Sequence, residues 1–141
     1  MALARSNRPL SPHLQIWRWG PAMLVSILHR VTGNGMAFVG LSLLLWWLGS
    51  IASGPEAYET FMTYVWTGAA GGLSSITAIL GKIVLVGLTW AFFQHAASGI
   101  RHLVLDIGVG YELSANARWS VFTLIVSVGL TALSWGFVLL R

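Results

Sequence analysis

Cysteine is absent from the 141 residues, and only four acidic residues stand against eight lysines and arginines. Without cysteine the chain supplies no disulfide, no thiolate ligand to haem iron and no ligand to an iron-sulfur cluster. The net charge of +4 comes from scarce acids, so it indicates no nucleic-acid partner. With 9% charged and 56% hydrophobic residues, the composition is that of an integral membrane protein rather than of a soluble domain.

Three stretches lack charge for long enough to cross a bilayer, at residues 31–53, 83–100 and 119–140. Helix start and stop signals extend them to predicted transmembrane helices at about 21–50, 75–105 and 118–140, after a cytoplasmic tail at 1–20. Between the first two, Ser53-Gly54-Pro55-Glu56 resembles a capping box ahead of a short amphipathic helix at the interface. The predicted fold is an all-α membrane protein, with three transmembrane helices and one short interfacial helix in a single domain of residues 1–141.

The basic residues indicate the orientation in the membrane. They precede the first span and flank the connection between the second and third spans, whereas the first connection carries only acids. These basic residues are Arg5, Arg8, Arg18, Arg30, Arg101 and Arg118. The positive-inside rule therefore predicts a cytoplasmic N-terminus and an outside C-terminus. The N-terminal segment has no apolar core ahead of a cleavage site, so no signal or transit peptide is expected.

His95 is the strongest candidate for chemistry. On a helix, His95, Gly99 and His102 share one face, and Gly99 leaves a flat gap that suits the edge of a planar cofactor. If Arg101 marks the headgroup level, His95 lies about 9 Å deeper, inside hydrocarbon. An ionisable side chain at that depth indicates a functional site, and neutral imidazole is the usual ligand of haem iron. The alternative is a histidine that only hydrogen bonds to a neighbouring helix.

His29 and His102 are the other candidate ligands. His102 shares its helix face with His95, so both cannot bind one iron from opposite sides, and a haem propionate contact suits its headgroup-level position. His29 is on another helix, at the interface and several ångströms shallower than His95 by helical rise. One chain therefore supplies one ligand, and a six-coordinate haem needs a partner subunit.

Four polar residues gather at the same cytoplasmic level. Arg30 and Arg101, together with His29 and His102, form a surplus of donors suited to haem propionates or a quinone, although arginines are common at cytoplasmic helix ends. Ser26, one turn from Arg30, either donates to a carbonyl oxygen or satisfies its own helix. Asp106 either pairs with Arg101 or His102 or delivers a proton.

Three sequence runs carry a family resemblance: RPLSPHLQI at residues 8–16, SILHRVTG at 26–33, and HAASGIRHLVLD at 95–106. In this order and on these helices they resemble the cytochrome b subunit of succinate dehydrogenase, the larger membrane anchor of respiratory complex II. The likeness covers nearly the whole chain, although Trp17 stands where many members have tyrosine.

The resemblance implies a role for each candidate residue. His95 matches the axial ligand of haem b, with the opposite ligand coming from the smaller anchor subunit. Ser26 and Arg30 match residues of the ubiquinone site, and Asp106 matches an acid near it. His29, Arg30 and His102 fall where the family contacts the haem propionates.

The predicted function follows from these matches. The chain is expected to be half of a heterodimeric haem-binding anchor in a bacterial cytoplasmic (inner) membrane, and to bind a smaller anchor subunit, an iron-sulfur subunit and a flavoprotein subunit. It has no succinate-oxidising chemistry of its own; with its partners it helps pass electrons from succinate to ubiquinone. The alternatives are the anchor of a related fumarate reductase and a non-redox scaffold or transport subunit.

Overall fold

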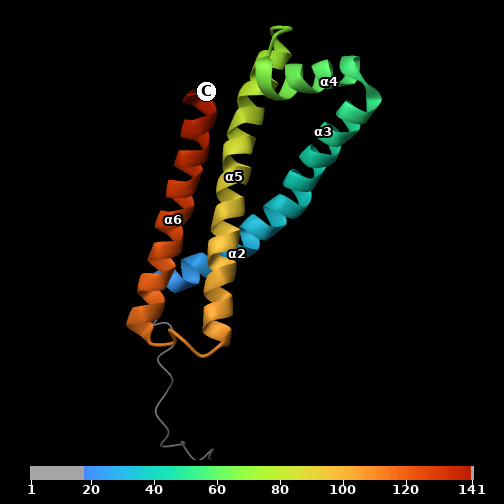
Figure 1. The fold of residues 1–141 in the computed structure, drawn as a ribbon. Helices are drawn as coiled ribbons and strands as arrows, with labels where there is room; N and C mark the ends of the chain where they lie inside the picture. The colour runs from blue at the N-terminus through green and yellow to red at the C-terminus, as the bar shows by residue number, and fades with distance from the viewer. Residues whose placement is uncertain (1–17, 141) are drawn as a thin grey trace, which may run out of the picture.

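The computed structural model describes residues 18–140; the first family run at residues 8–16, Trp17 and Arg141 lie outside this part. Within it, the chain is helical and contains no strand. Three helices are long and apolar enough to cross a membrane, at Pro21–Ser53, Leu73–Asp106 and Leu113–Leu140. A shorter helix joins the first two (Figure 1). The predicted all-α fold with three membrane spans and a short connecting helix is confirmed.

The first span combines α2 (Pro21–Gly35), a π-helical segment η1 (Met36–Gly40) and α3 (Leu41–Ser53). Pro21 stands in the first turn of α2, where its missing N–H removes no helical hydrogen bond. This span is inclined to the other two. In Figure 1 it crosses α5 at α2, and α3 then slopes away from α5 toward the opposite end of the molecule.

The short connection contains α4 (Pro55–Met62) and the π-helical segment η2 (Thr63–Thr67). The predicted capping box is wrong: Ser53 is the last residue of α3, and Gly54 precedes α4 without a side-chain cap. Gly54 has a φ of 105°, a conformation that favours glycine, so the backbone makes the corner between the two helices. Phe61 and Val65 are buried, whereas Tyr58 is exposed, so this connection is amphipathic as predicted.

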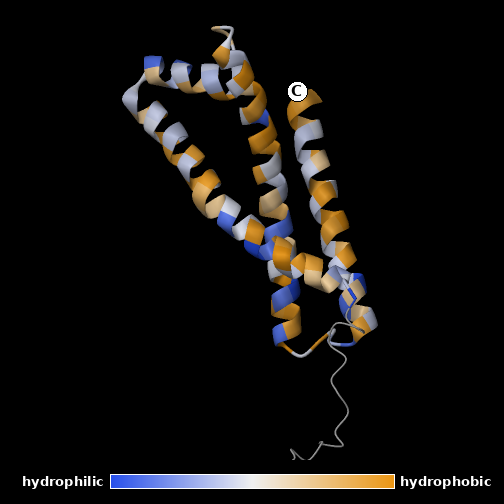
Figure 2. Ribbon diagram, turned by 180° about the vertical axis from the view of Figure 1, so that it is seen from behind, coloured by the Kyte–Doolittle hydropathy of each residue, from blue (hydrophilic) through white to orange (hydrophobic). Residues whose placement is uncertain are grey.

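The second and third spans are α5 (Leu73–Asp106) and α6 (Leu113–Leu140). They run side by side, and the C-terminal end of α6 lies at the same end of the molecule as α4 (Figure 1). α6 begins at Leu113 rather than near Arg118, because the helix continues beyond the charge-free stretch from which it was predicted. Figure 2 shows hydrophilic residues gathered where α2 crosses α5, while apolar residues dominate much of the remaining ribbon.

Small polar side chains fill the interior of the α5–α6 pair. The four buried residues of α6 are all serines and threonines: Ser120, Thr123, Ser127 and Thr131. The Ser127 hydroxyl donates to Oε1 of Gln94 on α5 over 2.7 Å, and Gln94 is completely buried. Nearer the C-terminal end of α5, the Arg101 guanidinium donates to the Asn116 side chain. Close approach of small residues and hydrogen bonds between helices stabilise such pairs in a membrane.

A glycine-to-alanine pair tests the packing of the short connection on α5. An added Cβ at Gly81 would overlap the carbonyl of Val65, whereas one at Gly87, on the same helix, meets nothing within 4 Å. Gly81→Ala is therefore expected to destabilise the chain by about 1–3 kcal/mol, the usual cost of overpacking. Thermal unfolding of the detergent-solubilised complex measures this, with Gly87→Ala as the control that should leave the midpoint nearly unchanged. Equal midpoints for the two variants would contradict the packing.

Candidate functional site

Three histidines from two helices lie in a row, which we call the histidine row: His95 and His102 of α5, with His29 of α2 between them. The His29 and His95 rings stack with centroids 3.9 Å apart and planes 11° apart. The His29 and His102 rings meet edge to face at 5.1 Å. Helical rise predicts that His29 lies on the cytoplasmic side of His95, but it does not predict direct contact, because contact depends on how α2 crosses α5.

The His95 ring is held by the backbone of α2. Its Nδ1 atom lies 3.0 Å from the carbonyl oxygen of His29 and 3.3 Å from the Thr32 hydroxyl oxygen. A hydrogen bond from Nδ1–H to the carbonyl fixes the tautomer in which Nε2 carries a free lone pair. The hydrogen bond to a neighbouring helix, which was the alternative interpretation, is present. It uses Nδ1 alone, and Nε2 hydrogen bonds to no residue in the range 18–140.

Two glycines bring the helices together at this point. An added Cβ at Gly33 would lie 2.8 Å from Cε1 of His95, so any larger residue there requires the ring to shift. At Gly99 an added Cβ would meet Cε1 of His29 at 3.9 Å. The flat gap predicted at Gly99 is therefore bordered by the His29 ring. The glycine that makes room for His95 is Gly33.

Alanine at Gly33 is expected to displace the His95 ring, because a flexible side chain must move when an added Cβ comes closer than 3.0 Å to it. Any cofactor bound through His95 should respond with a changed absorption spectrum or reduction potential. Gly35→Ala is the matched control on the same helix, where an added Cβ meets nothing within 4 Å. Identical spectra and potentials for both variants and the wild type would show that His95 holds no cofactor.

Ser98 was missed by sequence analysis. Its hydroxyl oxygen lies 2.7 Å from Nδ1 of His29, and the side chain is completely buried. The same hydroxyl lies 2.7 Å from the Gln94 carbonyl oxygen, one helical turn earlier. A small polar residue one turn after His95 was the available signal. Ser98 hydrogen bonds to Nδ1 of His29, and in the same way a backbone carbonyl of α2 hydrogen bonds to Nδ1 of His95.

Arg30 and Ser26 lie together at the exposed edge of the site. Nη2 of Arg30 donates to the Ser26 hydroxyl oxygen over 3.4 Å, one helical turn back along α2. The Arg30 side chain is exposed, and Ser26 is half-buried. The one-turn spacing of the two residues therefore places a guanidinium and a hydroxyl side by side, a pair able to bind one carbonyl or carboxylate oxygen.

Neither Arg101 nor Asp106 makes the contacts within the chain that were predicted for it. Arg101 is 6% exposed and is turned toward Asn116 of α6, so it does not join the histidine row. Its Nε atom is buried and has no hydrogen-bond partner within residues 18–140. Asp106 is exposed and forms no ion pair with any described residue, so the pairing with Arg101 or His102 is not observed.

The part of the chain that the structure describes forms no metal site from three or more of its own histidines or acids.

Comparison with known proteins identifies the family. Residues 4–134 match the model of the succinate dehydrogenase/fumarate reductase transmembrane subunit. The succinate dehydrogenase cytochrome b556 subunit of Paracoccus denitrificans is 36% identical over 130 residues, covering 92% of this chain and 91% of the relative. The Rickettsia felis protein of the same name is 34% identical over 130 residues, covering 92% of each chain.

A mitochondrial protein is similar to nearly the same extent. The succinate dehydrogenase cytochrome b560 subunit of Sus scrofa is 35% identical over 136 residues, covering 91% of this chain and 72% of the relative. The match of the family model over most of the chain agrees with three membrane-spanning helices and with the sequence runs around Ser26 and His95. The chain belongs to the family of succinate dehydrogenase cytochrome b subunits.

Proposed function

We propose that this chain is a membrane anchor of succinate dehydrogenase, that it supplies one axial ligand to haem b, and that it forms part of a ubiquinone-reduction site. The relatives named above are cytochrome b subunits of succinate dehydrogenase, and similarity extends over more than nine-tenths of this chain. The single observation that carries the haem assignment is the hydrogen bonding of the His95 ring, which occupies Nδ1 and leaves Nε2 free of the described residues.

His95 meets the requirements of an axial ligand. Its Nδ1 is tied to the His29 carbonyl, and its Nε2 is free of hydrogen bonds to the described residues. Ligating histidines use this arrangement, because the hydrogen bond at one nitrogen orients the ring and raises the basicity of the other. Gly33 and the stacked His29 ring hold the imidazole from two further sides.

The surrounding donors suit the haem propionates. His29, Arg30 and His102 lie beside or beyond His95 toward the predicted cytoplasmic surface, and none of them pairs with an acid of residues 18–140. Arg101 is turned toward Asn116 of α6 and is therefore not one of these donors. Charge-assisted hydrogen bonds to carboxylates are among the stronger ones in proteins.

The second axial ligand comes from a partner subunit. His29 and His95 are stacked face to face at 3.9 Å, so the two imidazoles could not both hold the same haem iron. This chain therefore offers one ligand. The smaller anchor subunit supplies the other, so each subunit forms half of the haem pocket.

The quinone head binds at Ser26 and Arg30. The Ser26 hydroxyl and the Arg30 guanidinium lie within 3.4 Å of each other and both reach the rim of the site, where they can donate to one quinone carbonyl. Asp106 is exposed at the end of α5 nearest this level, and as an acid without an ion pair among the described residues it is available to pass protons to the reduced quinone.

The chain provides binding and orientation, and its partners carry out succinate oxidation. A flavoprotein subunit and an iron-sulfur subunit dock on the cytoplasmic side of a bacterial inner membrane, where the N-terminus lies; the C-terminus is outside. When bound, haem supplies one-electron redox chemistry. His95, His29 and Arg30 fix its position and the charge around it.

Absorption spectroscopy of the purified membrane complex tests this proposal. A Soret band that changes on reduction with succinate, together with succinate:quinone reductase activity, is the expected result. A complex without a Soret band would refute the haem role and favour a non-redox scaffold. The family model also covers fumarate reductases, and a low-potential quinone in the purified complex would identify that alternative.

A further inference from the structure

An apolar cavity of about 350 Å³ lies away from the histidine row, between α3, the α4–η2 connection and the outer half of α5. Its walls are hydrocarbon and aromatic, including Leu44 and Trp47 of α3, Trp66 of η2 and Leu85 of α5. Leu44 and Trp47 are exposed. Because these exposed residues belong to a membrane-spanning helix, the cavity opens to the bilayer rather than to water.

Lys82 lies close to one wall of this cavity. Nζ of Lys82 lies 5.3 Å from the centroid of the Trp66 ring, and Trp66 is one of the cavity walls. Lys82 also precedes Leu85 by one helical turn on the same stripe of α5. The cation therefore lies beside a wall residue of the cavity, and it forms no ion pair with an acid of residues 18–140.

The depth of Lys82 matches that of lipid phosphates. Along α5, Lys82 lies about 28 Å of helical rise from Arg101. The hydrocarbon core is roughly 30 Å thick, so the two residues stand near opposite boundaries of the core. Lysine at such a boundary extends its ammonium group into the headgroup region. An ammonium without a protein counter-ion at that level attracts a phosphate.

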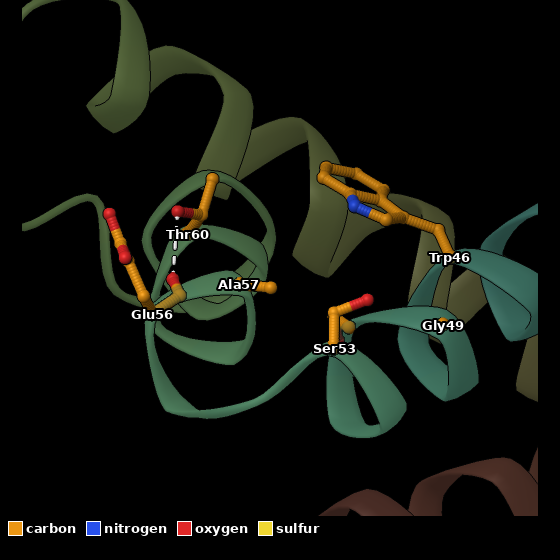
Figure 3. A pocket seen from close by; sticks show the side chains of 7 residues that line it. Trp46, Gly49, Ser53, Glu56, Ala57 and Thr60 are labelled. Carbon is orange, nitrogen blue, oxygen red and sulfur yellow. Dashed lines mark hydrogen bonds between the residues drawn. The ribbon is translucent and has the colours of Figure 1, made fainter.

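A neighbouring pocket has the opposite character. It lies between α3 and α4, with a volume of about 570 Å³, and its lining includes Trp46, Ser53, Glu56 and Thr60 (Figure 3). The Thr60 hydroxyl donates to the Glu56 backbone carbonyl. The Glu56 carboxylate forms no ion pair within the described part of the chain. Glu56 places a negative charge beside this pocket, which disfavours a phosphate there. An anionic headgroup at this end of the molecule is therefore directed to Lys82.

We propose that the cavity and Lys82 together bind one anionic phospholipid of the outer leaflet, with an acyl chain in the cavity and the phosphate on the ammonium group. An isoprenoid tail or a helix of another subunit would fill the cavity without needing a cation beside its wall. The lipid would also bridge α3 and α5 where the two helices diverge (Figure 1). This site is separate from the haem and quinone site.

Fluorescence quenching by brominated phosphatidylglycerol tests the proposal in the purified, delipidated complex, because Trp47 and Trp66 line the cavity. Saturable quenching is expected. Lys82→Gln should weaken lipid affinity about five-fold, the usual contribution of one lysine near an anionic membrane surface, and Lys82→Arg should retain the affinity. Leu44→Phe, which extends an exposed side chain into the cavity, should reduce the saturable quenching.

The controls separate lipid binding from general effects. Glu56→Gln removes a charge at the same end of the molecule and should leave the affinity unchanged or raise it slightly. Equal affinity in Lys82→Gln and wild type would overturn the headgroup assignment. Unchanged quenching in Leu44→Phe, or cross-linking of another subunit's helix to Trp47 in the native membrane, would overturn the acyl-chain assignment.

Discussion

Alanine in place of His95 is expected to lower the haem content of the purified complex at least about ten-fold. The loss of residues that merely orient a metal ligand costs 10- to 100-fold in metal affinity, and removal of the ligand itself should cost no less. Within the described residues, His95 has an imidazole whose Nδ1 is fixed by a backbone carbonyl and whose Nε2 is free, beside a glycine that no larger residue can replace without a shift.

Two histidine variants serve as controls for this prediction. His29→Ala and His102→Ala remove neighbours of the same chemical type, yet each should retain most of the haem and alter mainly its reduction potential, because propionate contacts are lost. The pyridine haemochrome assay measures haem per complex, and a redox titration measures the potential. Equal haem loss in all three variants would contradict the assignment of His95 as the ligand.

The second large effect is expected at the quinone site. Arg30→Ala should lower quinone reductase activity roughly 10- to 100-fold, because a hydrogen bond from a charged donor contributes about 1.5–3 kcal/mol. Ser26→Ala should have a smaller effect, since its hydroxyl is a neutral donor. Succinate oxidation with an artificial soluble acceptor should survive in both variants, because the electrons then bypass the membrane site.

Matched variants away from the site make this result interpretable. Ser134→Ala removes an exposed hydroxyl of α6 that donates only to its own helix, at the Leu130 carbonyl. Arg118→Ala removes another arginine from the predicted cytoplasmic end of a helix. Both should retain quinone reductase activity. If Arg30→Ala and Ser26→Ala lost both activities together, these residues would hold the assembly together rather than bind the quinone.

The three spans were predictable because a bilayer imposes a length and a polarity on any helix that crosses it. Charge-free runs gave the spans, Pro21 gave the start of the first helix, and Gly108 and Gly110, each with positive φ, follow the end of α5. Side-chain capping signals were less reliable where a glycine with positive φ formed the corner between two helices. At the corner before α4, Gly54 replaces the expected side-chain cap.

Contacts between helices were not predictable from periodicity within one helix. The roles of Thr32, Gly33 and Ser98 depend on where α2 crosses α5, and nothing in a single helix specifies that crossing point. Helical rise alone could order His29 and His95 by depth. It could not show that their rings touch.

Arg101 is an instructive exception, because its orientation was available in the sequence. Gln94, Ser98 and Arg101 have the same offsets of four and seven residues as His95, Gly99 and His102, shifted by one position. They therefore form an adjacent stripe of α5 that is buried, with Gln94 and Arg101 hydrogen bonded to α6. Grouping Arg101 with the histidines by membrane depth alone overlooked this stripe.

A density map of the whole complex from cryo-electron microscopy tests the central claim most directly. The account predicts a porphyrin at the junction of two anchor subunits, with Nε2 of His95 bonded to iron on one face and a ligand from the smaller subunit on the other. Its propionates should extend toward His29 and Arg30. Iron bonded to a different residue of this chain, or a His95 ring packed against another helix with no porphyrin beside it, would contradict the account.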